Sequence, residues 1–127
     1  MEQSSGIVFQ KKGSVTIGEI QNSVLLNNMN WRSLLEEIRE AIRQSDALHL
    51  LLDFHQVEHV SVEFFGEVKT LAEENSATGG TTRVCGLHKA TLEILNYLDA
   101  PSDLYMGAST GHAVLRYLRS LKHDGYL

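Results

Sequence analysis

The stretch LLLDFHQVEHVSVEFFGEVKTL, from Leu50 to Leu71, decides the fold because it contains a complete strand, loop and helix. Its first residues form a short apolar run through Phe54, interrupted only by Asp53, which is typical of a strand buried on both faces. Residues 55–59 are polar and turn-like. Ser61 then suits the N-cap of an amphipathic helix. The apolar residues that recur at helical spacing are Phe64, Phe65, Val68, Leu71 and Ala72.

Strands and helices alternate on both sides of this unit. Before it, apolar alternation predicts strands over 7–10, 15–20 and 23–26, with a turn at 11–13 and a helix from Trp31 capped by Asn28 or Asn30. After the helix 62–75, we expect a strand over 81–87, a helix over 89–98 ended by Pro101, an edge strand over 104–106 and a helix from Gly111. This order predicts an α/β fold. We expect a mixed sheet of four to six strands with a parallel core, flanked by about four helices, with the strand 49–54 central.

Length and composition restrict the class of protein. A chain of 127 residues with 43% hydrophobic and 21% charged residues is expected to form one globular domain, 1–127, with a loose tail over 1–5. The net charge of −5 disfavours a nucleic-acid or anionic-membrane surface. The sequence shows neither a signal peptide nor an apolar run of about 20 residues, so we expect a soluble, cytoplasmic protein that does not insert into membranes.

Three segments of the sequence resemble the STAS family, the anti-sigma-factor antagonist fold. The first is the strand with Asp53 and the loop and helix start that follow, which resemble the family segment Phe-Ile-Asp-Ser-Ser-Gly-Leu-Gly-Val-Leu. The second is Gly79-Gly80 and the strand up to Leu87, and the third is the helix that closes at Leu98-Asp99. The similarity runs from about Val15 to Leu121, and the order and spacing of its pieces carry it.

A gapless alignment to that motif places Gly66 on its last glycine, Ser61 on its aspartate and Phe64 on its first glycine. Val62 and Glu63 then fall on the two serines, of which the second is the usual phosphorylation site in the family. A phosphoserine carries a charge of about −1.5 to −2 and a carboxylate only −1, so Glu63 would imitate the phosphorylated state only in part. The alternative is that the helix dipole simply favours an acidic residue in the first turn.

Other residues of this segment have two interpretations each. Ser61 is either a displaced phosphate acceptor or only the helix N-cap. Asp53 ends a strand at the edge where α/β sheets place ligands and partners, but its match to a family aspartate implies a role in hydrogen bonding within the loop. Phe64 and Phe65 are consecutive, so either one is partly exposed as an anchor for a partner or a broad buried face accepts both.

The sequence gives little support for a metal site or for catalysis. His55 and His59 are four residues apart, but in a loop this spacing does not place them on one face, and no HExxH or Cys-His cluster surrounds them. Cys85, the only cysteine, lies in an apolar strand and is interpreted as a core residue. Ser61 lies in no GxSxG motif, and no glycine-rich phosphate loop is present. We therefore expect no metal, no cofactor and no enzymatic activity.

The resemblance implies a non-catalytic protein-interaction module in a partner-switching system. The partner would be an anti-sigma factor with serine-kinase activity or a STAS scaffold, and self-association into a homo-oligomer stays open. Alternatives are a STAS subunit of a transport or lipid-handling complex, a small-molecule or nucleotide-binding α/β domain, and an enzyme that uses the histidines or Cys85. The expected regulatory loop contains Asp53, Ser61, Val62, Glu63, Phe64, Phe65 and Gly66.

Overall fold

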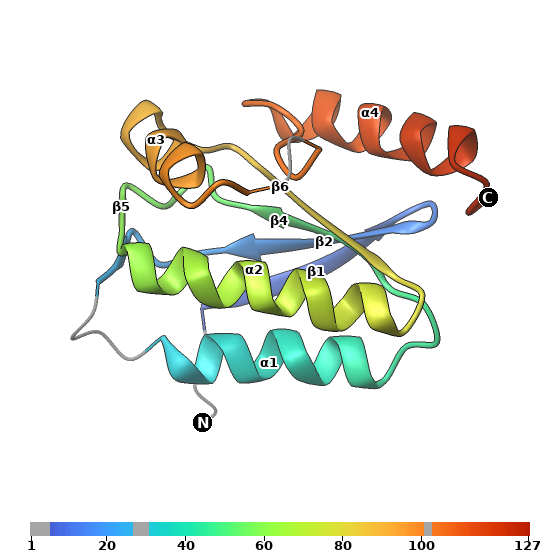
Figure 1. The fold of residues 1–127 in the computed structure, drawn as a ribbon, viewed down its shortest axis with the longest axis horizontal. Coiled ribbons are helices and arrows are strands. Elements are labelled where there is room, and N and C mark those ends of the chain that lie inside the picture. Colours follow the sequence, from blue (N-terminus) through green and yellow to red (C-terminus); the bar gives the residue numbers. More distant parts are fainter. Residues whose placement is uncertain (1–5, 27–30, 101–102) are drawn as a thin grey trace.

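Strands and helices alternate along the chain as expected. The computed structural model describes residues 6–26, 31–100 and 103–127 (Figure 1). Three expectations concern residues outside these ranges: the tail at 1–5, the caps Asn28 and Asn30, and the helix stop at Pro101. Trp31 holds the N-cap position of the first helix. The described elements are β1 (Ile7–Lys12), β2 (Val15–Ile20), β3 (Val24–Leu25), α1 (Arg32–Arg43), β4 (His49–Asp53), β5 (His59–Val60), α2 (Val62–Ala77), β6 (Thr81–Cys85), α3 (Lys89–Tyr97) and α4 (Thr110–His123).

The main sheet is mixed, and its core is parallel. In the described residues it has four strands in the order β1-β2-β4-β6, and β3 pairs with β5 in a second, two-stranded sheet. β1 and β2 are antiparallel, whereas β2, β4 and β6 are parallel to one another. β4 therefore lies in the interior of the sheet. The predicted α/β fold, with its parallel core and central strand, is confirmed.

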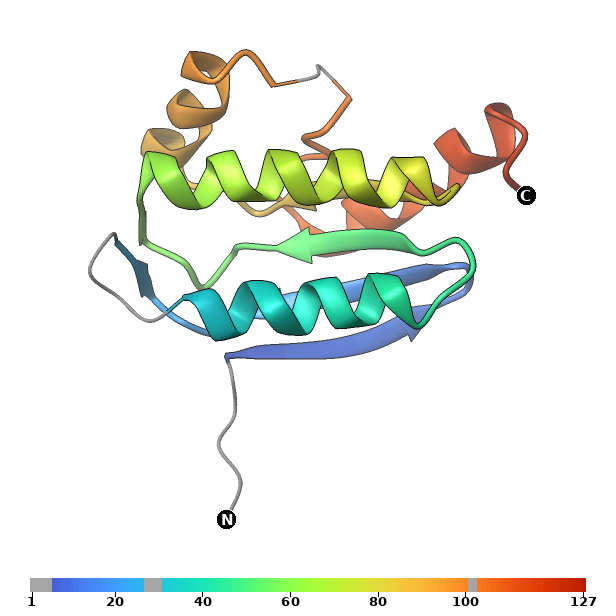
Figure 2. The same ribbon diagram turned by 60° about the horizontal axis from the view of Figure 1, so that its bottom comes forward.

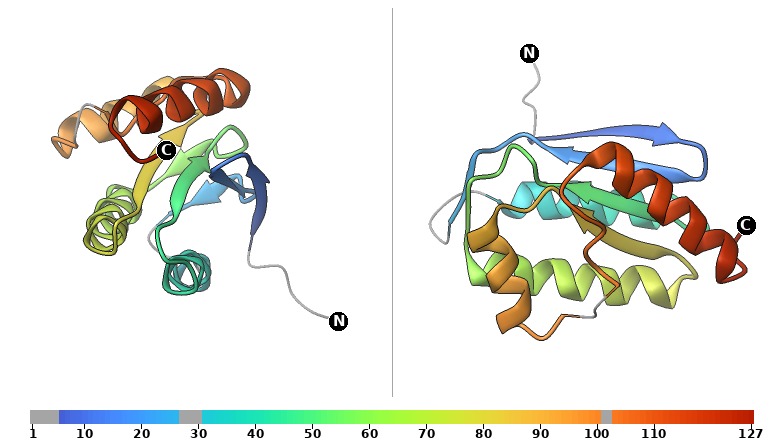
Figure 3. Two further views of the ribbon diagram at one scale, coloured as in Figure 1. Left: turned by 90° about the vertical axis from the view of Figure 1, so that its right-hand side faces the viewer. Right: turned by 90° about the horizontal axis from the view of Figure 1, so that it is seen from above.

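The helices cover the two faces of the main sheet unequally. α1 connects β3 to β4 and α2 connects β5 to β6, and Figure 2 shows these two helices side by side and running in the same direction. Crossovers between parallel strands have one hand, so successive crossovers in one direction across the sheet place their helices on the same face. α4 lies on the opposite face (Figure 3). We call the face under α1 and α2 the closed face and the face under α4 the open face.

The closed face contains the larger apolar core. Leu50, Leu52 and Phe54 point from β4 and the residue after it toward α1 and α2, and all three are buried. They pack against the buried helix residues Leu34, Ile38, Phe64, Val68 and Leu71. Arg39 of α1 lies 3.5 Å from Glu67 and 3.4 Å from Glu74, so ion pairs link the two helices above this core.

Of the two interpretations of Phe64 and Phe65, the broad buried face that accepts both is confirmed, and the partly exposed anchor is wrong. Phe64 is 0% and Phe65 is 1% exposed. The ring of Phe54 stacks on Phe65 at 5.2 Å between centroids, and the ring of Trp31 meets Phe64 edge-on at 5.5 Å. The closed face is thus wide enough to bury two consecutive aromatic side chains, so neither is available as an anchor for a partner in this structure.

Several element boundaries differ from the sequence predictions. Lys11 and Lys12 belong to β1, and the turn lies at 13–14. β6 ends at Cys85 because Gly86 takes a left-handed φ of 77°. The segment 104–106 forms one isolated parallel bridge, Val84 to Tyr105, rather than a full edge strand. His59 is part of the short strand β5 and not of the preceding loop.

The open face is more polar than the closed face. Its apolar part joins Ile17 and Leu51 to Ala113 and Tyr117 of α4. Beside them, Thr81 Oγ1 forms hydrogen bonds with His49 Nδ1 at 2.8 Å and with the Tyr117 hydroxyl. Burial raises the pKa of Tyr117 to about 12, so this phenol remains a neutral hydrogen-bonding group.

Candidate functional site

The start of α2 has the geometry that its sequence predicts. Ser61 is the N-cap, with an extended backbone at φ −83° and ψ 157°, and its Oγ accepts a hydrogen bond from the Phe64 backbone N–H at 3.1 Å. The Ser61 backbone N–H donates to the Leu25 carbonyl at 2.7 Å, which ties the loop to β3. The capping role of Ser61 is therefore confirmed, and whether it also accepts phosphate stays a prediction.

Only part of the expected regulatory loop reaches the solvent. Val62 is 39% exposed, Glu63 is exposed in the first turn of α2, and Ser61 is half-buried. Gly66 is also half-buried, and a Cβ added there would meet no atom within 4 Å. With Phe64 and Phe65 inside the core and Gly66 one turn further along α2, the solvent-accessible residues at the beginning of the helix are Ser61, Val62 and Glu63. We call these three residues the α2 start.

Asp53 has a different environment from the α2 start. It is only 3% exposed and its side chain points to the open face, whereas α2 covers the closed face. Its Oδ1 accepts a hydrogen bond from the His55 backbone N–H at 3.0 Å, and its Oδ2 lies 3.0 Å from His55 Nδ1. Oδ2 also accepts a hydrogen bond of 2.7 Å from Thr110 Oγ1 at the beginning of α4. Asp53 thus organises the loop after β4, as expected, and in addition binds α4 to it.

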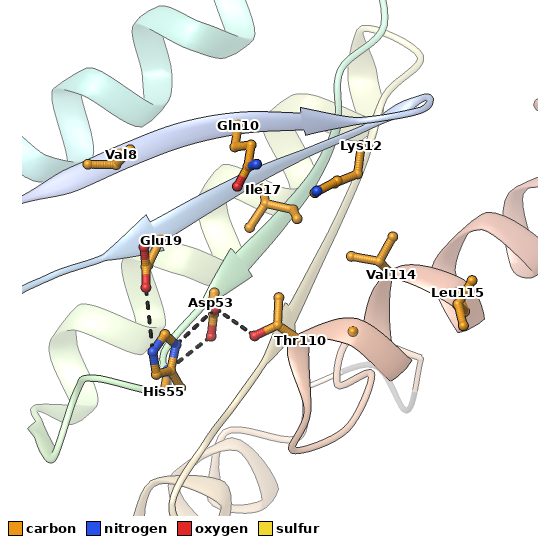
Figure 4. Close-up of a pocket in the computed structure, with 11 residues that line it drawn as sticks. Val8, Gln10, Lys12, Ile17, Glu19, Asp53, His55, Thr110, Val114 and Leu115 are labelled. Atoms are coloured by element: carbon orange, nitrogen blue, oxygen red, sulfur yellow. Dashed lines mark hydrogen bonds and ion pairs between the residues drawn. The ribbon is translucent and has the colours of Figure 1, made fainter.

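A cavity of about 470 Å³ opens beside Asp53, between the β1–β2 hairpin and the start of α4 (Figure 4). Its polar wall contains Glu19, whose Oε2 lies 3.4 Å from His55 Nε2 and accepts a hydrogen bond from Gln56 Nε2 at 3.0 Å. Figure 4 shows Glu19, Asp53, His55 and Thr110 pointing toward one another. The other lining residues are Val8, Gln10, Lys12, Ile17, Gly111, Val114 and Leu115.

This convergence was not predicted from the sequence. Glu19 and Thr110 belong to no recognisable motif, and the histidine nearest to His55 in the sequence, His59, lies in the short strand β5 and not in the cluster. Glu19 and Asp53 both stand near the carboxyl end of a predicted strand. The carboxyl ends of parallel strands meet at one edge of a sheet, so these positions indicate that the two side chains could lie close together. The register between β2 and β4, which pairs Glu19 with Asp53, was needed to use that signal.

Cys85 is a core residue beside Asp53. It pairs with Asp53 across β4 and β6 and is fully buried. Burial, together with the nearby Asp53 carboxylate, raises the pKa of the Cys85 thiol to about 12. A thiol with so high a pKa is not a nucleophile at neutral pH, which agrees with the core interpretation of Cys85.

Comparisons with solved structures identify the fold. A STAS-domain anti-sigma-factor antagonist protein from Planctomyces limnophilus superimposes with a TM-score of 0.77, at 14% identity, over 88% of this chain and 97% of that one. The chain has the STAS fold. The Bacillus cell-fate determinant SpoIIAA, in its phosphorylated form, gives a TM-score of 0.68 at 14% identity, over 87% of this chain and 97% of SpoIIAA.

An anion transporter contains the same fold. The murine anion transporter Slc26a9 matches with a TM-score of 0.71 and 15% identity, over 87% of this chain but only 18% of the transporter. No protein-family model matches the sequence, and no curated protein matches it significantly. Within the described residues, no helix has the length and apolar character needed to cross a bilayer. The STAS fold therefore occurs both in small antagonist proteins and as one part of a transporter.

Proposed function

We propose that this chain is a non-catalytic protein-interaction module, related in function to anti-sigma-factor antagonists, whose partner contacts the α2 start. The observation that carries the proposal is the exposed carboxylate of Glu63 in the first turn of α2. It stands where the motif alignment places the phosphorylated serine, two residues after the N-cap Ser61. The partner is proposed to be an anti-sigma factor with serine-kinase activity or a STAS scaffold in the cytoplasm.

The charge of Glu63 determines how this module would differ from a switchable relative. A partner surface that accepts an unmodified serine would meet a permanent negative charge here, weaker than that of a phosphate group. The chain would then bind its partner weakly and without control by phosphorylation at this position. Val62, the other exposed residue of the first turn, offers an apolar contact beside the charge.

The test is the substitution Glu63→Ser, with Glu73→Ser as its matched control. Glu73 is an exposed glutamate of the same helix, ten residues and therefore about 15 Å further along it. We expect Glu63→Ser to bind a family kinase up to about tenfold more tightly, which corresponds to about 1.4 kcal/mol. The gain should shrink at high salt, because exposed charges are screened over about 8 Å at physiological ionic strength. Titration calorimetry at two salt concentrations measures both effects.

Phosphorylation supplies a second readout. After incubation with the kinase and ATP, mass spectrometry should find phosphate at position 63 of Glu63→Ser and none at positions 62 and 63 of the natural chain. Stoichiometric phosphate on Ser61 of the natural chain would show that the acceptor has moved by two positions. Equal affinity of Glu63→Ser and the natural chain at both salt concentrations would reduce Glu63 to a residue that only favours the helix start.

One observation favours a second candidate function, that of a STAS subunit in a transport complex. It is the match of 87% of this chain to 18% of an anion transporter. In that case the natural chain should co-purify with a membrane-embedded transporter after detergent extraction, and Glu63→Ser should not change its recovery. Recovery of a soluble kinase or scaffold would favour the antagonist-like function.

A further inference from the structure

The sheet register places two carboxylates side by side on the open face. Glu19 and Asp53 are direct partners across the parallel strands β2 and β4. Like charges in directly opposed positions destabilise a sheet. Water screens the charge of Asp53 only weakly, because the Asp53 side chain is only 4% exposed. An arrangement of this kind needs positive charge or hydrogen-bond donors close to the two carboxylates.

The protein supplies an imidazole at this place. His55 stands between the carboxylates, with Nδ1 3.0 Å from Asp53 Oδ2 and Nε2 3.4 Å from Glu19 Oε2. One ligand atom from each of the three residues lies within 4.8 Å of the other two. The Thr110 hydroxyl, at the beginning of α4, donates a hydrogen bond of 2.7 Å to Asp53 Oδ2 and holds that carboxylate in the cluster.

We propose that Glu19, Asp53 and His55 form a binding site for a divalent first-row transition-metal ion. Two carboxylate oxygens and one imidazole nitrogen are a ligand set that suits Zn²⁺ and its neighbours, and the imidazole disfavours Mg²⁺. Ligands of a tetrahedral Zn²⁺ ion lie about 3.4 Å apart at bond lengths of about 2.1 Å. The three ligand atoms already lie within 4.8 Å of one another, and His55, whose side chain is 48% exposed, is the ligand with most room to move toward that spacing.

The cavity gives the site its open coordination position. The wall formed by Glu19, Asp53 and His55 faces the space of about 470 Å³ beside the start of α4, which has room for water or a small ligand on the ion. The Asp53 carboxylate is held by hydrogen bonds from the His55 backbone and Thr110, so one ligand is already oriented. Such support of a ligand by neighbouring hydrogen bonds is common in metal sites.

The test is titration of the natural chain with ZnCl₂ in a buffer that does not bind metal, followed by calorimetry and by the melting temperature. We expect one Zn²⁺ per chain and a higher melting temperature with Zn²⁺, and no response to MgCl₂. His55→Asn and Glu19→Gln should each weaken Zn²⁺ binding by about tenfold or more. Asp53 is left unchanged in the test because it supports the fold.

Two controls separate this site from general zinc binding by histidines. His123→Asn removes an exposed histidine that lies 3.3 Å from Asp124, a comparable His–Asp pair, and should leave Zn²⁺ binding unchanged. Circular dichroism of metal-free Glu19→Gln should show a folded protein, so that loss of binding is not loss of fold. No binding by the natural chain would overturn the proposal, and so would binding that survives both His55→Asn and Glu19→Gln or that is lost in His123→Asn.

Discussion

The two faces of the main sheet are built for different purposes. The closed face meets two helices and buries a continuous apolar core that includes Phe54, Phe64 and Phe65. The open face meets α4 and carries Glu19, Asp53 and His55 beside a cavity. The difference shows that one face maintains the STAS fold while polar side chains gather on the other. The proposed partner surface, at the N-terminal end of α2 on the closed face, is therefore separate from the proposed metal site on the open face.

The largest effect is expected from the closed face. Phe64→Ala should lower the free energy of unfolding by about 3–5 kcal/mol, because it leaves a cavity in a packed aromatic cluster. The control is Leu115→Ala on α4, where the side chain is 55% exposed and the expected change is within about 0.5 kcal/mol. Urea unfolding measures both. Similar losses for the two variants would remove the contrast between the faces.

A second large effect is expected where β6 ends beneath the polar cluster. A Cβ at Gly86 would lie 2.8 Å from the His55 backbone nitrogen and 2.9 Å from Asp53 Oδ1, and φ is 77°. Gly86→Ala should therefore destabilise the fold by roughly 2 kcal/mol or more, since a left-handed φ alone costs about 1–2 kcal/mol for a residue with a Cβ. It should also weaken Zn²⁺ binding through its contact with Asp53.

Gly66→Ala is the matched control for that prediction. Gly66 lies inside α2, and a Cβ there meets no atom within 4 Å. Alanine is a better helix former than glycine by about 0.8–1 kcal/mol, so this substitution should stabilise the chain. Opposite signs for the two Gly→Ala variants in thermal unfolding would support the described geometry. A stable Gly86→Ala would contradict it.

A smaller effect is expected from the cap of α2. Ser61→Ala should cost about 1 kcal/mol, because the Phe64 backbone N–H loses its acceptor. Ser61→Asn keeps a capping oxygen and should unfold near the natural chain. Chemical denaturation of the three proteins gives the comparison. If Asn were as costly as Ala, the role of Ser61 in the structure would differ from that of a cap.

The pH dependence of stability should depend on the buried His49. Burial, assisted by the positive charge of Arg83, lowers the pKa of His49. Because the unfolded chain binds this proton more readily, stability is full above the unfolded pKa of about 6.5 and falls as the pH decreases toward the lower folded pKa. The difference in unfolding free energy between pH 7.5 and 5.5 should be smaller in His49→Gln than in the natural chain.

Local features of the sequence predicted most of the fold. The order of strands and helices follows from apolar periodicity, and the Ser61 cap follows from a contact between residues only three positions apart. The burial of both Phe64 and Phe65 was not predictable in this way. It depends on Trp31, whose ring packs against Phe64, and on Phe54, whose ring stacks on Phe65. These two residues come from separate elements.

The polar cluster of the open face could not be predicted from the sequence for the same reason. Thr110 and Asp53 are 57 residues apart in the sequence, and only the docking of α4 brings them into contact. Glu19 and Asp53 meet only through the register of β2 with β4. Residue types near strand ends can suggest such a cluster, but the register that joins them is a property of the folded sheet.

Quantitative affinity capture from the source cells tests the central claim, that the α2 start binds a protein partner, most directly. The tagged natural chain is compared with Val62→Asp, which adds a charge to the exposed apolar residue, with Glu63→Ser and with the control Glu73→Ser. We predict that one partner protein is recovered with the natural chain and with Glu73→Ser, is reduced by Val62→Asp and is enriched by Glu63→Ser. Equal recovery of that protein with all four baits would contradict the claim.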